Sequence, residues 1–312
     1  GRHGGAGPGG APSGRLQGVE QEGEKTMGKI VIVGSGPAGC SAALYAARAG
    51  QEVVVISMGM GALSKAELIQ NYYGFEEGIT GAELYRQGVA GAKAVGAEFI
   101  TAEVVGLDYT GSLVVQTTEG DYPADAVILA TGAGRIAPKI AGLAEHEGRG
   151  VSYCATCDAF FYRGKTAAVL GSGEYALHEV QALLPLAGRV ILCTNGEPLT
   201  ADFPEGVEIC TEKLAAVEGE EKVSALRLEN GELLPVEGLF VALGVAGSAA
   251  LARKLGAPVE NGRIVVDEKM QTGIPGLYAA GDCTGGLLQV CKAVYEGALA
   301  ATEAIKQIRG KK

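Results

Sequence analysis

Two cysteines separated by two residues, Cys154 and Cys157, are the side chains best suited to redox chemistry, and Asp158 follows them directly. A disulfide between such cysteines closes a small ring, so it can open and close with little backbone motion. A Cys-x-x-Cys pair commonly lowers the pKa of one thiol and makes a thiolate available near neutral pH. The carboxyl group of Asp158 could carry the proton that the leaving thiolate needs. We predict Cys154, Cys157 and Asp158 as catalytic residues.

The Cys-x-x-Cys pair could also be half of a zinc site or a pair of inert buried thiols. A structural zinc site normally needs a second Cys-x-x-Cys or a pair of histidines. The three histidines, His3, His146 and His178, lack ligand spacing, so we predict no metal site. The remaining five of the seven cysteines are assigned no role: Cys40, Cys193, Cys210, Cys283 and Cys291.

A glycine-rich turn with G-x-G-x-x-G spacing lies between a predicted strand at 29–33 and a predicted helix at 41–49, and a second strand follows at 52–56. In this context the glycines permit a tight turn, a close approach to a pyrophosphate and close packing of helix on strand. The helix N-terminus offers N–H groups to the phosphates. The alternative is a plain turn with incidental glycines. We predict a dinucleotide site at Gly34-Ser35-Gly36-Pro37-Ala38-Gly39; the acid that often holds the ribose is replaced by Ser57.

The same unit occurs again, with strands at 166–170 and 189–193 around a helix that ends near Leu186. Its turn is Gly171-Ser172-Gly173-Glu174-Tyr175-Ala176, where Tyr175 is bulky for a close phosphate approach. The second strand runs into Thr194-Asn195-Gly196, without the arginine or acid that a nicotinamide dinucleotide needs. We predict a retained fold that has lost its nicotinamide site.

Two such units predict an α/β protein with two Rossmann-like, three-layer ββα domains, the second inserted into the first. We expect the first domain at 27–134 plus 246–312 and the inserted domain at 135–245. A β-meander is predicted over 98–126. Gly281-Asp282 follows the strand 277–280, where ligands of α/β folds bind, although the aspartate could also be a helix cap.

The composition excludes several classes of protein. The net charge is −10 and the chain has no basic cluster, which argues against nucleic-acid binding. No apolar run is long enough for a membrane span. We expect residues 1–26 to be a disordered leader or a vector-derived remnant. We also expect a cytoplasmic protein in which the cysteines outside the redox pair are reduced thiols.

Taken together, the motifs resemble the low-molecular-weight thioredoxin reductase family across Met27 to Ile308. The matching strings are Gly34-Ser35-Gly36-Pro37-Ala38-Gly39, Ala130-Thr131-Gly132, the stretch 148–158 with Cys154-Ala155-Thr156-Cys157-Asp158, and Pro275-Gly276-Leu277-Tyr278-Ala279-Ala280-Gly281-Asp282.

The resemblance implies an FAD bound by the first glycine turn, by Ala130, Thr131 and Gly132, and by Gly281 and Asp282. It also implies that Asn71 and Gln289 lie near the flavin, that Cys157 is the sulfur facing it, and that Asp158 is the acid–base residue. The family is homodimeric, and its inserted domain rotates to present the cysteine pair to thioredoxin.

Two departures resemble one branch, the ferredoxin-dependent flavin thioredoxin reductases. Leu63-Ser64-Lys65-Ala66 replaces the family's Gly-Gly-Gln stretch, and Thr194-Asn195-Gly196 replaces the basic string that binds NADPH. Gly285-Gly286-Leu287-Leu288-Gln289 after Asp282 also resembles this branch. The resemblance implies electrons from reduced ferredoxin in place of NADPH. The alternatives are an NAD(P)H-dependent reductase, an FAD-dependent dithiol oxidase, and a flavin-bound redox sensor without turnover.

Overall fold

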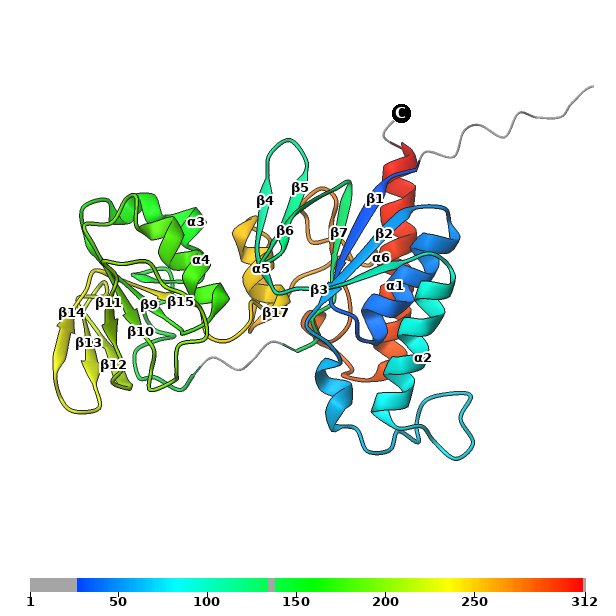
Figure 1. Cartoon of the computed structure of the whole chain (residues 1–312), viewed down its shortest axis with the longest axis horizontal. Coiled ribbons are helices and arrows are strands. Elements are labelled where there is room, and N and C mark those ends of the chain that lie inside the picture. Colours follow the sequence, from blue (N-terminus) through cyan, green and yellow to red (C-terminus); the bar gives the residue numbers. More distant parts are fainter. Residues whose placement is uncertain (1–26, 134–137, 311–312) are drawn as a thin grey trace, which may run out of the picture.

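The computed structural model describes residues 27–133 and 138–310, which form two lobes, each built around a five-stranded parallel sheet (Figure 1). The expected leader, residues 1–26, lies outside the described residues. No helix within the described ranges is both long enough and apolar enough to cross a membrane. The two sheets match the predicted α/β class with two Rossmann-like units.

The first lobe holds a parallel sheet in the order β18-β7-β1-β2-β3. Its strands are β1 (Lys29–Val33), β2 (Glu52–Ser57), β3 (Glu98–Thr101), β7 (Ala126–Leu129) and β18 (Leu277–Ala279). Its helices are α1 (Pro37–Arg48), η1 (Gly61–Lys65), α2 (Gly81–Ala94), η3 (Asp282–Thr284) and α6 (Val290–Gly310).

Alternating side chains of β1 divide this lobe into three layers. Ile30 and Ile32 pack in one apolar cluster with the alanines of α1 and α6, whereas Val31 and Val33 pack in another with the antiparallel strands. Successive side chains of a strand point to opposite faces, so an all-apolar strand such as β1 must be covered on both sides. The result is the predicted ββα arrangement.

The antiparallel layer is a three-stranded meander of β4 (Val104–Tyr109), β5 (Leu113–Thr117) and β6 (Gly120–Ala124). The prediction that the meander begins at Glu98 is wrong, because its first four residues belong to the main sheet. Residues Glu98–Thr101 form β3, which pairs in parallel with β2 at the edge of the main sheet. Four residues cannot show from their own pattern which neighbour they pair with.

The second lobe repeats the design with the strand order β11-β10-β9-β15-β8. These strands are β8 (Val151–Ser152), β9 (Thr166–Leu170), β10 (Arg189–Cys193), β11 (Glu208–Cys210) and β15 (Gly238–Val241). The short α3 (Ala155–Asp158), η2 (Ala159–Tyr162) and α4 (Glu174–Leu183) lie on one face, and a small antiparallel sheet of β12 (Leu214–Glu218), β13 (Ala225–Leu228) and β14 (Leu233–Pro235) covers the other.

After β15 the chain returns to the first lobe through α5 (Ser248–Lys254) and the hairpin of β16 (Val259–Glu260) and β17 (Arg263–Ile264). Figure 1 shows α5 and the meander between the two parallel sheets. The second parallel sheet thus spans residues 151–241, and the domain boundaries at 135 and 245 remain predictions.

Candidate functional site

A cavity of about 650 Å³ lies at the carboxyl ends of β1, β7 and β18 in the first lobe. It contains every residue predicted to bind the cofactor except Gly39: Gly34, Ser35, Gly36, Pro37, Ala38, Asn71, Ala130, Thr131, Gly132, Gly281, Asp282 and Gln289. These residues come from five separate segments of the chain. The carboxyl edge of a parallel sheet is where α/β folds bind nucleotides.

The three glycines of the first turn have three different reasons to lack a side chain. Gly34 has φ +109°, and a Cβ there would lie 2.3 Å from the carbonyl oxygen of Ala130. A Cβ on Gly39 would lie 1.8 Å from the carbonyl oxygen of Gly34, so this glycine allows helix and strand to touch. A Cβ on Gly36 would meet no atom of the chain within 4 Å, because it would project into open space.

The N-terminus of α1 is open to an anion at this point. Gly36 is the N-cap, no side chain caps the helix, and its first turn carries no acidic residue. Uncapped N–H groups and the helix dipole favour a phosphate there. A pyrophosphate therefore fits against Gly36, and the size of the cavity is sufficient for a dinucleotide to extend from it.

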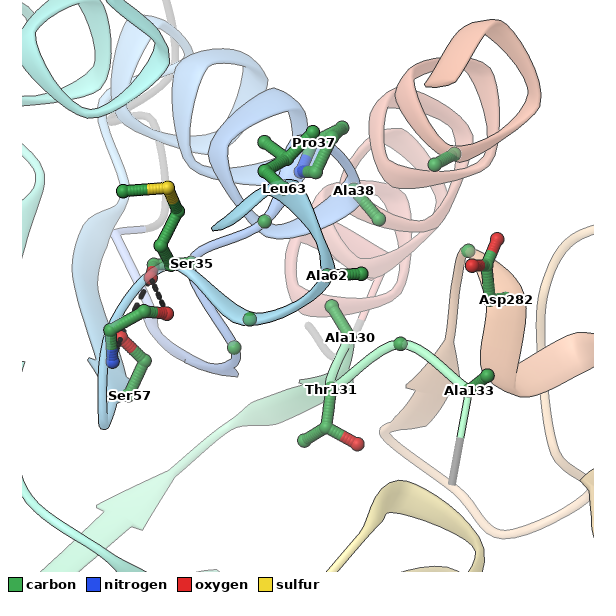
Figure 2. Close-up of a pocket in the computed structure, with 18 of the residues that line it drawn as sticks. Ser35, Pro37, Ala38, Ser57, Ala62, Leu63, Ala130, Thr131, Ala133 and Asp282 are labelled. Atoms are coloured by element: carbon green, nitrogen blue, oxygen red, sulfur yellow. Dashed lines mark hydrogen bonds between the residues drawn. The ribbon is translucent and has the colours of Figure 1, made fainter. Parts of the chain in front are cut away.

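Hydroxyl groups occupy the place where a ribose-binding acid often stands. Ser57, at the end of β2, lies 2.7 Å from Ser35 through their Oγ atoms, and Ser35 Oγ lies 3.0 Å from the Tyr85 hydroxyl. Figure 2 shows Ser35 and Ser57 on one side of the cavity and Asp282 on the other. Both ends of the cavity thus present polar groups suited to the hydroxyls of a nucleotide.

An ion pair on α6, which no sequence motif predicted, holds the turn that carries Gly281 and Asp282. Glu296 accepts a hydrogen bond from the Gly281 N–H at 2.8 Å, and Lys292 donates to the Gly281 carbonyl at 2.9 Å. Lys292 and Glu296 also pair with each other at 3.0 Å. Their i, i+4 spacing was a visible signal, but it is equally typical of an exposed helix face.

Asn71 and Gln289, 218 residues apart in the chain, meet at the cavity. The Asn71 side-chain amide donates to Gln289 Oε1 at 2.9 Å. Gln289 directly precedes the first residue of α6. The structure brings these two predicted residues together.

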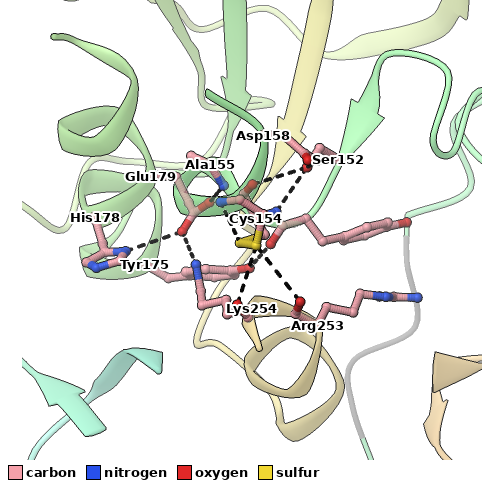
Figure 3. A network of polar contacts seen from close by, with 11 residues as sticks. Ser152, Cys154, Ala155, Asp158, Tyr175, His178, Glu179, Arg253 and Lys254 are labelled. Carbon is pink, nitrogen blue, oxygen red and sulfur yellow. Dashed lines mark hydrogen bonds and ion pairs between the residues drawn. A yellow bond between two sulfur atoms is a disulfide. The ribbon is translucent and has the colours of Figure 1, made fainter. Parts of the chain in front are cut away.

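The Cys154–Cys157 disulfide lies in the second lobe, at the start of α3. Cys154 is buried and Cys157 is exposed. The amide N–H of Cys157 donates to the sulfur of Cys154 at 3.1 Å, a contact that would stabilise a thiolate at position 154. Ser152 links the pair to Asp158: its Oγ accepts from the Cys154 N–H at 3.1 Å and donates to Asp158 Oδ2 at 2.7 Å (Figure 3).

A buried ion pair between Lys254 of α5 and Glu179 of α4 lies beside the disulfide (Figure 3). Glu179 also accepts a hydrogen bond from the N–H of Ala155, the residue that follows Cys154, and lies 3.3 Å from His178 Nδ1. Burial raises the pKa of the Glu179 carboxyl, but the contacts with His178, Lys254 and Ala155 outweigh it, and the net pKa lies below its usual value. Glu179 is therefore a charged carboxylate that ties the redox helix to α5.

The C-terminal end of α5 makes further contacts with the second lobe. Arg253 lies over the ring of Tyr153 at 4.5 Å and pairs with Glu147 at 3.2 Å. Lys254 lies 5.5 Å from the centre of the Tyr175 ring. The carbonyl oxygen of Lys254 is 3.5 Å from the sulfur of Cys157. We call Arg253 and Lys254 the α5 clamp, because they hold the helix end against the disulfide.

The N-terminal end of α5 is attached to the cofactor cavity. Ser248 donates its N–H to Thr131 Oγ1 at 2.8 Å, and the Thr131 N–H donates to Ser248 Oγ at 3.1 Å. The seven residues of α5 span about 10 Å at 1.5 Å per residue. Neither Cys154 nor Cys157 lines the cavity. In this arrangement the helix separates the disulfide from the cavity while it contacts both.

The second glycine turn differs sharply from the first. Thr200, from the loop after β10, donates its N–H to the Ser172 carbonyl at 2.8 Å, and a Cβ on Gly173 would lie 3.0 Å from the Thr200 hydroxyl. Tyr175 is buried, and its hydroxyl donates to the carbonyl of Tyr153 at 3.1 Å. The bulky residue noted in the sequence thus packs beneath the redox pair, and a loop of the chain itself lies over the turn.

Comparison with known proteins places the chain in a family. The family model described as "Pyridine nucleotide-disulphide oxidoreductase" matches residues 28–297. This chain belongs to that family. A thioredoxin reductase of Aquifex aeolicus is 35% identical over 307 residues, which cover 91% of this chain and 94% of the relative.

Two solved structures are also similar. The atypical thioredoxin reductase of Desulfovibrio vulgaris Hildenborough is 40% identical with a TM-score of 0.86, over 91% of this chain and 98% of that one. A ferredoxin-flavin thioredoxin reductase of Clostridium acetobutylicum is 35% identical with a TM-score of 0.70, over 91% of this chain and 99% of that one.

The predicted resemblance, fold class and enzyme class are therefore confirmed: the chain is a flavin disulfide oxidoreductase of the thioredoxin reductase type. The family implies FAD, and the open α1 N-terminus and the cavity fit that cofactor. The roles of individual residues remain predictions. Among residues 27–133 and 138–310 no group of three or more His, Cys, Asp or Glu side chains could hold a metal ion.

Proposed function

We propose that this protein transfers electrons from reduced ferredoxin to FAD and then through the Cys154–Cys157 pair to thioredoxin. One contrast carries the proposal. The first dinucleotide unit has an open turn beside a large cavity, whereas the turn of the second is covered by Thr200 and backed by Tyr175. Within the described residues, one open dinucleotide turn with a disulfide in the neighbouring lobe suits a flavin disulfide reductase that takes its electrons from a protein.

The cysteine pair performs the final exchange. FAD, when bound, accepts electrons one at a time and delivers them in pairs. When the disulfide opens, one sulfur leaves as a thiolate. The Cys157 N–H stabilises a negative charge on the sulfur of Cys154, so Cys154 is the favoured leaving thiolate. The dithiol then reduces a disulfide of thioredoxin by thiol–disulfide exchange.

Ser152 holds the Asp158 carboxylate close to the cysteine pair. Ser152 contacts both the Cys154 N–H and the Asp158 carboxylate. A carboxylate held beside the pair can take up or return the proton of a leaving thiol. We assign Asp158 as the acid–base residue and Ser152 as the group that positions it.

The second lobe must move for Cys157 to reach the cavity, because α5 stands between them. The α5 clamp then has to release Glu179, Tyr153 and Tyr175, while Ser248 stays attached to Thr131. We propose that the inserted domain, residues 135–245, rotates as a body in a homodimer of the cytoplasm, and that this rotation presents the disulfide in turn to the flavin and to thioredoxin.

The electron donor is tested by anaerobic stopped-flow reduction of the purified yellow protein. We expect reduced ferredoxin to bleach the flavin absorbance at a rate that supports turnover, and NADPH and NADH to leave it unchanged for many turnover times. Bleaching by NADPH with no response to ferredoxin would establish the NAD(P)H-dependent alternative. Rapid oxygen consumption with small dithiols would instead identify a dithiol oxidase.

A further inference from the structure

Two cysteines that the redox mechanism does not use lie side by side at one end of the second lobe. Cys193 is the last residue of β10 and Cys210 the last residue of β11, and the two are register partners on these neighbouring parallel strands. Both side chains pack on the same apolar cluster, so they point to the same face of the sheet. Adjacent strands lie about 4.8 Å apart, within the range of about 4.4–6.8 Å between Cα atoms that a disulfide spans.

The two thiols differ in exposure. Cys193 is fully buried, whereas Cys210 is only partly buried, on a strand at the edge of the sheet. A small reagent can therefore reach Cys210 first, with Cys193 waiting behind it. An accessible thiol beside a second thiol is the arrangement of a peroxide-sensitive pair.

The surroundings also favour a thiolate at Cys210. The side-chain hydrogen bond with the neighbouring Cys193 thiol lowers the pKa of Cys210 to about 6. Burial, Glu212 and Glu232 act in the opposite direction, and the N–H of Glu212 adds a favourable hydrogen bond. The contact with Cys210, burial and the nearby Glu208 raise the pKa of Cys193.

We propose that Cys193 and Cys210 form a second redox site, distinct from the Cys154–Cys157 pair, that reacts with hydroperoxides. The Cys210 thiolate attacks one oxygen of the peroxide, the O–O bond breaks, and the departing oxygen takes a proton from solvent as alcohol or water. Cys210 is then a sulfenic acid. The Cys193 sulfur displaces its hydroxyl group, which leaves as water with the Cys193 proton, and a Cys193–Cys210 disulfide results. The peroxide gains the two electrons that the thiols lose.

The site lies at the carboxyl ends of β10 and β11, beside the Thr194-Asn195-Gly196 stretch where the sequence lacks nicotinamide-binding residues. The Asn195 side chain accepts the Leu214 N–H at 2.8 Å and ties this stretch to β12. A new disulfide would join the edge strand β11 to the sheet at the same place. The modification would therefore hold the edge strand β11 more firmly to β10.

The test uses the FAD-loaded full chain with the Cys154–Cys157 disulfide closed, in a Cys291→Ser background that removes the exposed thiol of α6. One equivalent of hydrogen peroxide at pH 7 is added, and free thiols and linked peptides are measured under non-reducing conditions. We expect the loss of two thiols per chain and a peptide that links Cys193 to Cys210. In Cys210→Ser, which changes only a partly exposed side chain, we expect no loss.

A second measurement follows the rate of Cys210 alkylation by iodoacetamide as a function of pH. We expect the rate to rise with a midpoint near pH 6, whereas an ordinary thiol has a pKa of about 8.5. Absence of the linked peptide would overturn the proposal, as would equal thiol loss in the Cys210→Ser protein. Neither result would bear on reduction of the flavin or on thioredoxin turnover, so the two proposals fail separately.

Discussion

The two glycine turns of this protein share a backbone plan and differ in what lies over them. At Gly36 an added Cβ would meet no atom of the chain within 4 Å, whereas at Gly173 it would meet the hydroxyl of Thr200 at 3.0 Å. Around the first turn the chain leaves a cavity of about 650 Å³. Around the second, a loop and the side chain of Tyr175 take up the space. A strand, a glycine turn and a helix therefore specify the fold of a dinucleotide unit, and residues outside the motif decide whether it can hold a nucleotide.

The second lobe has acquired a different use for the same elements. Helix α4, which would present its N-terminus to a pyrophosphate, contributes Tyr175 and Glu179 to the surroundings of the disulfide. The contrast is between a unit that holds a cofactor and a unit that holds the group which the cofactor reduces. Substitutions that change one unit at a time test this contrast.

The largest effect is expected from Cys157→Ser, which removes half of the redox pair. We expect disulfide reductase activity to fall on the order of 10³-fold or more, because loss of one member of a catalytic unit removes its whole contribution. FAD content should stay the same, since Cys157 does not line the cavity. Thioredoxin reduction is the assay, and Cys291→Ser, an exposed cysteine on α6, is the matched control with full activity expected. Residual activity near the control value would show that another thiol does the chemistry.

Lys254→Met tests the contact that joins the two lobes. It leaves the Glu179 carboxylate buried without its cation, which costs about 3–5 kcal/mol. In the wild type the pKa of Glu179 is below its unfolded value of about 4.3, so its stabilisation is present at neutral pH and lost as the pH falls. In the variant, burial should raise that pKa, and the contribution should then weaken as the pH rises.

Urea unfolding at several pH values from about 3 to 8 measures both effects. Lys306→Met is the control, because the lysine of this ion pair on α6 is exposed. Equal stability of Lys254→Met and the wild type at pH 7 would mean that the ion pair is absent in solution.

Gly36→Ala and Gly173→Ala form a matched pair across the two units. The methyl group at position 36 would enter the space that we assign to the pyrophosphate, at a cost of about 1–3 kcal/mol, or about 5- to 150-fold in the FAD dissociation constant. The same change at position 173 should leave FAD affinity unchanged. Fluorescence titration of the apoprotein with FAD gives both constants, and a larger effect at position 173 would reverse the assignment of the two units.

The smallest effect is expected from Thr200→Gly, which removes the side chain that lies over Gly173 in the second turn. We expect no NADPH binding by calorimetry and unchanged turnover, because the Thr194-Asn195-Gly196 stretch supplies neither an arginine nor an acid for the nucleotide. Micromolar NADPH binding by this variant would show that the Thr200 side chain alone blocks the site and that the missing basic residues do not decide binding.

Local patterns in the sequence were enough to predict β1, β9 and β10, which have the predicted bounds. A buried parallel strand is a short apolar run, and a glycine turn marks its end. The helix starts were less accurate: α1 begins at Pro37, four residues before the predicted start, because proline fits the first turn and gives no apolar signal.

The predicted cofactor residues were brought together because most of them belong to turns at one edge of one sheet. The contacts around the disulfide had no such signal. Glu179 and Lys254 are 75 residues apart, and a single glutamate or lysine in an amphipathic helix is normally exposed. Cys193 and Cys210 were assigned no role for the same reason, since only the strand register shows that they are neighbours.

The central claim is that FAD in the first unit exchanges electrons with the Cys154–Cys157 disulfide in the second. An anaerobic dithionite titration of the FAD-loaded protein, followed by alkylation and peptide mapping, tests it most directly. We predict uptake of four electrons per chain, two by FAD and two by the disulfide, with new thiols at positions 154 and 157. The FAD-free protein should keep its disulfide under the same treatment. Uptake of two electrons with the disulfide still closed would contradict the account.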